Sequence, residues 1–339
     1  MIGPDYLVYK LCGTMGTDFC EASTSSLFDF KERSWSGKMR ELLGLSEAVY
    51  PTIRGCAQIV GTLQEKLAEE LGLAPDVEII AGTGDNPATS ISMGLLTDKR
   101  PILSLGTSGV LVSAREKVDF SVKGKNILFS FDNQKFYNLV QGAVQSTGSG
   151  FGWWINNILQ SDDMQGEEKD IDLAKLGESP ILFYPHLVGE KTIYSDASVR
   201  GAFLGLGTET SRAQMTQAVM EGIAFAVREL MTEMGFAKEC ADSIKVTGGG
   251  AKSALWLQIL ADVLNVDIEQ VSGKAGAAYG IAQVAAQCHT GTKKLEQIGK
   301  QAVTVKERFS PREYNVKLYD EKYKKYLRIY QALKTIMGD

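Results

Sequence analysis

The sequence predicts an α/β protein rich in glycine loops, and two observations support that class. Glycine accounts for 35 of the 339 residues and gathers in short clusters. Several clusters stand where an apolar, β-branched run ends and a helical pattern begins, which is the strand–loop–helix layout of α/β domains. The clusters lie at residues 82–84, 106–109, 148–152, 201–207 and 248–250.

The first hundred residues carry helical patterns and one short apolar run. The strand is predicted from VEIIA, which ends at Gly82 and is rich in β-branched residues. The polar stretch TDKR before Pro101 predicts a domain boundary near residues 96–100. The elements expected here are helices at 4–10 and 62–72, a strand at 77–81 and a helix from about residue 86.

The middle of the chain predicts a β-hairpin followed by two more strands. Two alternating runs, at 101–105 and 110–113, flank the four-residue turn GTSG, which has glycine at both ends. The remaining elements expected here are strands at 127–131 and 136–140 and a helix at 149–159.

The last third predicts a β-α-β-α run and a C-terminal helix. Ser211 and Gln214 form a capping box ahead of an apolar stripe at helical spacing. Tyrosines at 319, 323, 326 and 330, with Leu333, predict a second stripe, which we interpret as packing. The run itself consists of strands at 244–247 and 266–271 and helices at 253–264 and 275–286.

Composition excludes several classes of protein. The net charge of −5 argues against a nucleic-acid partner. No apolar run approaches the roughly 18 residues that a membrane span needs, so we expect a soluble, cytoplasmic protein without a membrane partner. The five cysteines form no CxxC pair, and we interpret the two histidines, His186 and His289, as structural residues. We assign no metal ligands, and catalysis has to rely on carboxylates and backbone groups.

The segment IKVTGGGAKS at 244–253 is the strongest local signal for a ligand. A strand ends in three glycines and leads into a helix, so the backbone can approach an anion or a nucleotide closely. A P-loop is disfavoured because GxxxxGK[ST] occurs nowhere in the chain. A dinucleotide site remains an alternative, in which Glu269 would bind the ribose.

Two further segments carry chemistry. The turn GTSG offers backbone amides and two hydroxyls that can surround a phosphate. Asp85 stands between a glycine loop and a helix start, so it is either a helix N-cap or a base that accepts a hydroxyl proton during phosphoryl transfer.

Taken together and in order, these segments resemble the FGGY family of carbohydrate kinases. The resemblance covers essentially the whole chain, and several ordered matches are more specific than any one of them. The matching stretches are PDYLVYKLCG (4–13), TDFCEAS (17–23), AGTGDNPA (81–88), SLGTSG (104–109), YPHLVGEK (184–191), GAFLGL (201–206), QMTQAVME (214–221) and TGGGAKS (247–253).

The resemblance implies an actin-like ATPase (ribonuclease H-like) fold with ATP and a sugar in a cleft. It implies that Asp85 is the catalytic base and that Gly106 and Thr107 form the phosphate-binding turn. It also implies nucleotide contacts at Gly148, Gly249, Gly250, Ala251 and Lys252. Mg²⁺ is expected with ATP, because the charge that develops on the phosphates has to be neutralised.

One family motif has no counterpart in this sequence. The Asp-x-Gly-Thr phosphate loop of the first domain is absent. We therefore expect residues 1–97 to be the C-terminal remnant of the N-terminal, sugar-binding domain. Residues 98–339 are expected to be a complete C-terminal, nucleotide-binding domain.

The expected activity is phosphorylation of D-xylulose to D-xylulose 5-phosphate, with ATP as the donor. The alternatives are a catalytically silent nucleotide-binding fragment, or a kinase for another pentulose, a polyol or a sugar acid. A complementing N-terminal fragment or a second copy of the chain, as a homodimer, are the macromolecular partners to consider.

Overall fold

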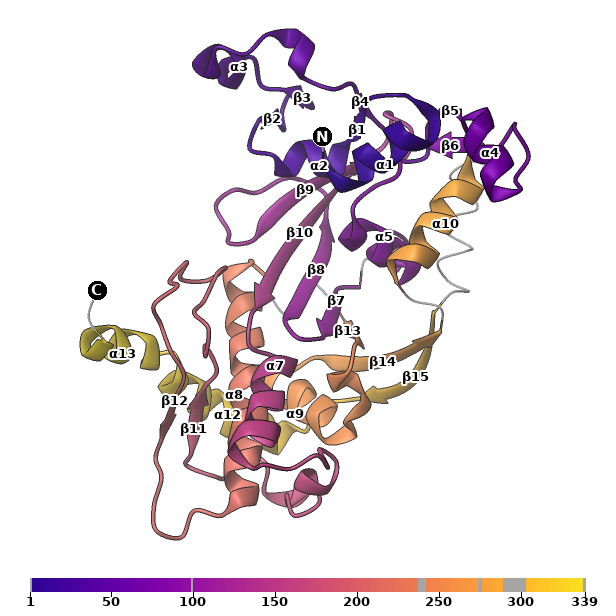
Figure 1. The fold of residues 1–339 in the computed structure, drawn as a ribbon. Helices are drawn as coiled ribbons and strands as arrows, with labels where there is room; N and C mark the ends of the chain where they lie inside the picture. Colours follow the sequence, from indigo (N-terminus) through magenta and orange to yellow (C-terminus); the bar gives the residue numbers. More distant parts are fainter. Residues whose placement is uncertain (1, 99, 237–241, 274–275, 289–302, 338–339) are drawn as a thin grey trace.

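A mixed β-sheet of seven strands runs through the centre of the computed structural model, which describes residues 2–98, 100–236, 242–273, 276–288 and 303–337 (Figure 1). The strand order is β15-β14-β13-β7-β8-β10-β9. β13 is parallel to β7 and to β14, and the other neighbouring pairs are antiparallel. The predicted α/β class is confirmed.

The predicted strands of this sheet are present. In the hairpin, Ile102 pairs with Val112 and Leu105 pairs with Gly109. β15 was not predicted, because the three charged residues at 306–308 interrupt its apolar alternation, as an edge strand with mostly exposed side chains permits. The bounds are β7 Ile102–Leu105, β8 Gly109–Arg115, β9 Lys125–Ser130, β10 Phe136–Val144, β13 Ser243–Thr247, β14 Asp267–Gly273 and β15 Val303–Phe309.

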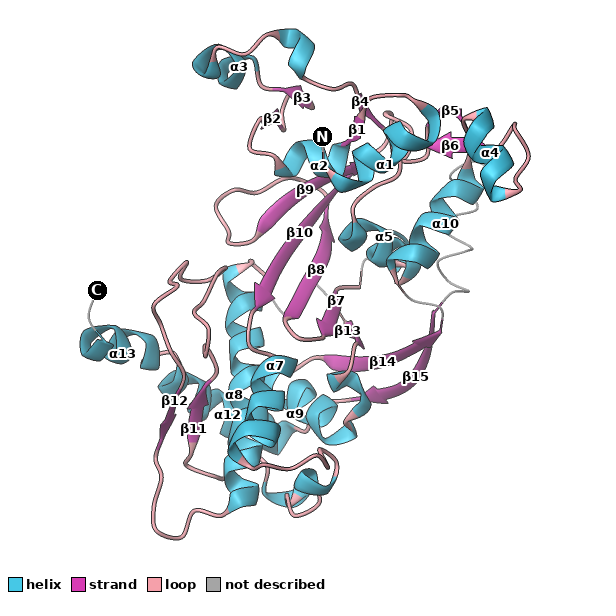
Figure 2. Cartoon of the chain, in the orientation of Figure 1, coloured by secondary structure: helices cyan, strands magenta, loops and turns pink. Residues whose placement is uncertain are grey.

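One face of the sheet is covered by helices α8 (Arg212–Glu233) and α9 (Ala254–Leu264), and it carries the largest apolar core (Figure 2). The capping box that opens α8 is confirmed, since Ser211 Oγ accepts from Gln214 N at 3.2 Å and Gln214 Oε1 accepts from Ser211 N at 2.9 Å.

The C-terminal tyrosine stripe packs on α8, as predicted. Its side chains are buried, and the rings of Tyr323 and Phe225 lie 5.9 Å apart. The expectation of one continuous helix was wrong: α12 (Glu313–Tyr326) and α13 (Ile329–Met337) are separate. The backbone tightens between them, where Arg328 N donates to Lys325 O. The apolar spacing continues across this break, so periodicity alone could not reveal it.

The opposite face is covered by the short helices α2 (Phe19–Thr24), α5 (Asp85–Ser92) and α6 (Leu95–Asp98). Helix α5 packs against α10 (Ala277–Gln287) (Figure 1). The apolar cluster on this face contains Cys20, Met93, Leu95, Ile102, Val112, Ile127 and Leu139.

The remaining elements are short. The helix predicted at 62–72 begins later, at α4, because residues before Gln64 form a strand that pairs with β6. The bounds are α1 Gly3–Cys12, β1 Thr17–Asp18, β2 Phe28–Asp29, β3 Ser34–Trp35, α3 Gly37–Leu43, β4 Ile53–Arg54, β5 Ile59–Thr62, α4 Glu65–Leu71, β6 Glu78–Ile80, α7 Gly148–Trp153, a π-helical turn Trp154–Ile158, β11 Leu182–Tyr184 and β12 Ala202–Leu204.

Within the described residues, no helix combines the length and the apolar character needed to cross a membrane. Of the two histidines, His186 is fully buried, and burial lowers its pKa to about 4. This agrees with a structural role. His289 lies outside the described residues.

The contact between α5 and α10 depends on a glycine. A Cβ at position 280 would lie 1.7 Å from the carbonyl oxygen of Ala88. We expect Gly280→Ala to lower the free energy of unfolding by at least about 2 kcal/mol, although alanine favours helix, because the two backbones would have to separate. Urea denaturation measures this. Gly37→Ala is the control, since a Cβ at position 37 would lie 4.0 Å from the nearest atom, Arg40 Nη2. Equal effects of the two substitutions on the free energy of unfolding would contradict the contact.

Burial of Glu229 predicts a pH dependence of stability. Burial, followed by the charges of Glu233 and Glu190, raises its pKa to about 7, and the hydroxyl of Tyr194 donates to its carboxylate. The folded state therefore holds a proton that the unfolded state releases, and stability falls as the pH rises from about 4.5 to 7. Glu229→Gln should reduce this fall by about 1.4 kcal/mol for each pKa unit of the shift.

Chemical denaturation at several pH values between 4.5 and 7 tests this expectation. Glu69→Gln is the control, because the Glu69 side chain is exposed on α4. If the two variants show the same slope of unfolding free energy against pH, Glu229 does not retain its proton in the folded state.

Candidate active site

Asp85 is the first residue of helix α5, directly after the loop formed by Gly82, Thr83 and Gly84. Its side chain is exposed, and its Oδ1 accepts a hydrogen bond from Asn86 N at 2.7 Å. The interpretation of Asp85 as the helix N-cap was wrong, because Gly84 occupies that position. The carboxylate is thus accessible from solvent.

The buried carboxylate of Asp18 is hydrogen-bonded to the loop that precedes Asp85. Thr83 Oγ1 donates to Asp18 Oδ2 at 2.6 Å. Asp18 also caps α2, since its carboxylate oxygens accept from Cys20 N at 3.1 Å and from Glu21 N at 3.0 Å. Burial raises the pKa of Asp18 to about 7, even though all three hydrogen bonds favour its charged form.

Glu21 adds a second carboxyl group beside the loop. Burial raises its pKa, and the charges of Asp5 and Asp85 act in the same direction. A Cβ at position 84 would lie 2.8 Å from Glu21 Oε1, so the glycine permits this close approach. Asp18, Cys20 and Glu21 place potential ligand atoms within 4.8 Å of one another. The hydrogen bonds that Asp18 already accepts make it a structural acceptor.

The turn between β7 and β8 contacts the start of α7. Gly148 N donates to Gly106 O at 2.9 Å, and Ser149 N donates to Thr107 O at 3.0 Å. A Cβ at position 148 would lie only 2.4 Å from Gly106 O. Side-chain-free backbone is therefore required where these two predicted binding segments meet.

The third predicted segment follows β13 and joins the same cluster. Gly248 has φ 96°, and a Cβ there would lie 2.6 Å from Leu105 O. A short 3₁₀ turn, Gly250–Lys252, follows; Gly249 and Lys252 are exposed, whereas Ala251 is buried. The exposed backbone can therefore face a ligand.

Ser253 fastens the end of this loop. Its Oγ accepts from Trp256 N at 3.1 Å, which caps α9, and the same hydroxyl donates to Glu168 Oε2 at 2.7 Å. Glu168 was not identified from the sequence, because no local pattern links residues so far apart.

The predicted nucleotide residues are thus brought together at one end of strands β7, β10 and β13. Asp85 lies on α5, which covers one face of the same sheet. Among the residues that the structure describes, no hydrogen bond joins the Asp85 side chain to these turns. Asp18 and Thr83 were missed as functional candidates. Asp18 could have been identified from the sequence as the N-cap of a helix, because it directly precedes Phe19, Cys20 and Glu21 at the start of α2.

The dinucleotide alternative is overturned by the surroundings of Glu269. Its carboxylate is fully buried and accepts from Arg100 Nη1 and Arg308 Nη2, both at 2.5 Å, and from Ser243 Oγ at 3.1 Å. A group engaged in these contacts cannot bind a ribose hydroxyl without breaking them.

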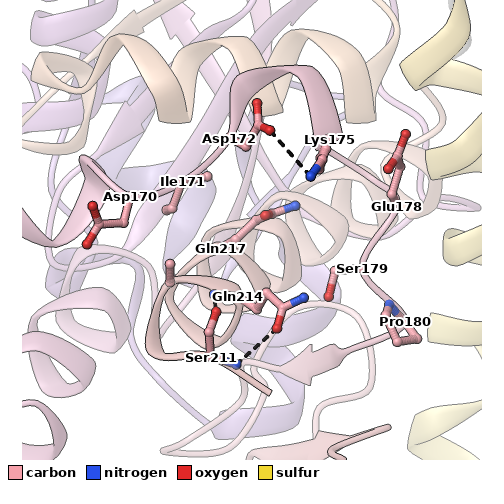
Figure 3. Close-up of a pocket in the computed structure, with 11 residues that line it drawn as sticks. Asp170, Ile171, Asp172, Lys175, Glu178, Ser179, Pro180, Ser211, Gln214 and Gln217 are labelled. Carbon is pink, nitrogen blue, oxygen red and sulfur yellow. Dashed lines mark hydrogen bonds and ion pairs between the residues drawn. The ribbon is translucent and has the colours of Figure 1, made fainter. Parts of the chain in front are cut away.

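A cavity of about 460 Å³ lies beside the start of α8 (Figure 3). Three carboxylates line it, and its one lysine, Lys175, pairs with Asp172 at 3.8 Å. This charge disfavours a triphosphate, and none of the predicted site residues lines the cavity. The lining residues are Asp170, Ile171, Asp172, Lys175, Glu178, Ser179, Pro180, Ser211, Ala213, Gln214 and Gln217.

Solved structures show the same fold over nearly the whole chain. A xyloylose kinase from Brucella ovis is 30% identical, with a TM-score of 0.86 over 98% of this chain and 68% of that one. A ligand-bound xylulose kinase from Lactobacillus acidophilus is 24% identical, with a TM-score of 0.87 over 97% of this chain and 67% of that one. The expected actin-like ATPase fold is confirmed.

Family models match both parts of the chain. The N-terminal domain model of the FGGY family of carbohydrate kinases matches residues 1–92, and the C-terminal domain model matches residues 102–288. The chain therefore belongs to the FGGY family of carbohydrate kinases. The xylulose kinase of Staphylococcus xylosus is 30% identical over 97% of this chain and 68% of that relative, and the xylulose kinase of Staphylococcus epidermidis RP62A is 31% identical over 100% and 68%, respectively.

The contact between Gly148 and Gly106 predicts that a side chain at position 148 weakens nucleotide binding. Gly148→Ala would force the two turns apart, so we expect ATP affinity to fall roughly tenfold or more, a loss of about 1.4 kcal/mol. Calorimetric titration with ATP and Mg²⁺ measures this. Gly207→Ala is the control, because open space surrounds that position; unchanged affinity in Gly148→Ala would remove the turn from the nucleotide site.

Proposed function

We propose that the protein is an ATP-dependent sugar kinase that converts D-xylulose to D-xylulose 5-phosphate. The observation that carries the proposal is the convergence of three glycine turns at one end of the sheet, two of which require backbone without a side chain. Backbone N–H groups in such turns suit a phosphate chain. The choice of sugar rests on the relatives, which are named xylulose kinases.

In the proposed reaction, a sugar hydroxyl oxygen attacks the γ-phosphorus of ATP. A new P–O bond forms as the bond to the β–γ bridging oxygen breaks, and ADP leaves. Asp85 accepts the hydroxyl proton, a role that fits its exposed carboxylate. Its place at the start of α5 keeps the group on a fixed element.

The glycine turns would hold the nucleotide. Gly106 and Thr107 contact the phosphates, and Gly148, Gly249, Gly250 and Ala251 line the path of the nucleotide. The exposed ammonium group of Lys252 adds positive charge. These contacts need no titratable group other than Lys252.

Mg²⁺ is proposed to accompany ATP and, when bound, to neutralise charge on the phosphates. Carboxylate oxygens are the ligands that Mg²⁺ prefers. The carboxylate of Glu21, which lies beside Gly84, is of this kind.

Two alternatives remain as outcomes of the test. Among similar folds are a gluconate kinase from Lactobacillus acidophilus and a glycerol kinase from Plasmodium falciparum, at 24% and 20% identity, so a sugar acid or a polyol is a reasonable competitor. A silent nucleotide-binding chain would bind ATP and transfer phosphate to no sugar.

The test measures ADP release with ATP, Mg²⁺ and a panel of D-xylulose, D-ribulose, gluconate and glycerol. We expect D-xylulose to give the highest kcat/KM. Asp85→Asn should lower kcat by roughly 100-fold or more, because proton acceptance is lost. Calorimetric affinity for ATP should stay within about twofold, since the hydrogen bond described for the Asp85 side chain goes to Asn86 and not to a predicted nucleotide residue. Omission of Mg²⁺ should abolish turnover.

The outcomes separate the hypotheses. Full turnover by Asp85→Asn would exclude the base role, and a preference for another acceptor would change the sugar but not the class. ATP binding without turnover on any sugar would favour the silent chain. Failure to bind ATP would overturn the proposal altogether.

We also propose that a segment with an Asp-x-Gly-Thr loop, which these 339 residues do not contain, completes the phosphate site. This segment would pack on the exposed apolar side chains of Tyr6 and Leu7 on α1. Adding the corresponding segment of a relative should raise kcat. A second copy of the chain could instead cover the surface at Tyr6 and Leu7. Analytical ultracentrifugation distinguishes the two, because only the second case gives a dimer of the chain alone.

A further inference from the structure

We propose that the hydrogen bond between Thr83 and Asp18 positions Asp85 for reaction. Neither residue is expected to touch substrate, so both are positioning residues. The inference rests on the proposed function, because it concerns the geometry of the proposed base. It identifies a function for a buried carboxyl group that the reaction itself does not use.

Among residues 82–84, Thr83 alone has a side chain that can anchor the loop. Its neighbours Gly82 and Gly84 have no side chain, and Gly82 adopts φ 76°, a conformation that glycine favours. A glycine-rich loop has high conformational entropy when it is not tethered. The backbone bond from Gly82 N to Cys56 O, at 2.9 Å, holds the loop before Thr83. After that point the Thr83 hydroxyl holds the loop through its bond to Asp18, and Cys20 Sγ of α2 contacts the backbone of Gly84.

Asp18 is a rigid acceptor for that hydroxyl. Its side chain is only 3% exposed. The Oδ2 atom accepts both Thr83 Oγ1, at 2.6 Å, and Cys20 N, at 3.1 Å, and Oδ1 accepts Glu21 N at 3.0 Å. Because backbone donors fix two of these bonds, the carboxylate cannot rotate to follow a moving loop.

Helix α2, which Asp18 caps, is itself fastened to the central sheet. Leu128 N of β9 donates to Ser23 Oγ at 3.0 Å. Cys20 is buried in the apolar cluster that also contains Met93, at the end of α5, and Ile127 of β9. The chain of contacts thus leads from β9 through α2 and Asp18 to Thr83, two residues before the proposed base.

A purely structural cap would not need Thr83. The capping bonds of Asp18 go to Cys20 and Glu21 and are complete without the threonine. The hydroxyl bond spans 65 positions in sequence and ends in the loop, not in α2. The substitution Thr83→Val therefore separates the two roles, since it removes the hydroxyl and leaves the cap in place.

The test compares Thr83→Val with Thr83→Ser and with Thr14→Val. Thr83→Ser retains the hydroxyl. Thr14→Val is the matched control, because it removes a threonine hydrogen bond, to Val60 O at 2.9 Å, from the same part of the chain. Hydrogen–deuterium exchange is measured on a peptide covering residues 82–92 and, for reference, on one covering 109–144.

We expect Thr83→Val to speed exchange in the first peptide about tenfold and to leave the second unchanged, whereas Thr83→Ser and Thr14→Val resemble the parent protein. In the kinase assay, Thr83→Val should lower kcat roughly tenfold, as expected for a misplaced base, with ATP affinity within about twofold. Thr83→Ser should restore kcat.

The two readouts distinguish this inference from the proposed function. Unchanged exchange in Thr83→Val would overturn the tether, whatever the activity. Faster exchange with unchanged kcat would show that the tether does not position the base. If the parent protein transfers no phosphate, the proposed function fails, and exchange still decides whether Thr83 and Asp18 hold the loop.

Discussion

The close approach of backbone to backbone at the end of strands β7, β10 and β13 is the constraint on which the site depends. At Gly148 and Gly248, a single carbon atom would collide with a carbonyl oxygen of the β7–β8 hairpin. Because no side chain fits at these two positions, peptide groups from three distant segments gather in one place. A ligand can then be bound by backbone, and the binding surface depends little on rotamers.

The sheet brings these segments together without help from sequence proximity. β13 inserts between β7 and β14 in parallel, so its glycine loop emerges beside the hairpin turn. Antiparallel pairing of β10 with β8 returns the chain to the same end, where Gly148 meets Gly106. The apolar core formed with α8 and α9 holds the strands in this order.

Much of this arrangement could be predicted because the local signals were strong. The hairpin, the capping box at Ser211 and the strand before Gly248 all follow from short-range chemistry, and the order of motifs indicated the family. What failed required long-range information: β15 is an exposed edge strand, and the break between α12 and α13 leaves the apolar spacing intact. Glu269 had the correct spacing for a ribose ligand, but its engagement with Arg100 and Arg308 depends on tertiary structure. The link between Thr83 and Asp18 was hidden for the same reason.

The packing of α5 on α10 has a mechanical consequence. Gly280 lies against the backbone of Ala88, Gly276 N donates to Ser92 Oγ at 3.0 Å, and Lys245 Nζ donates to Met93 O at 2.6 Å. Helix α5, which begins with Asp85, is thus held against the part of the structure that bears the glycine turns after β7, β10 and β13. The distance between Asp85 and these turns therefore stays fixed for as long as the contacts of α5 with α10 and with Lys245 persist.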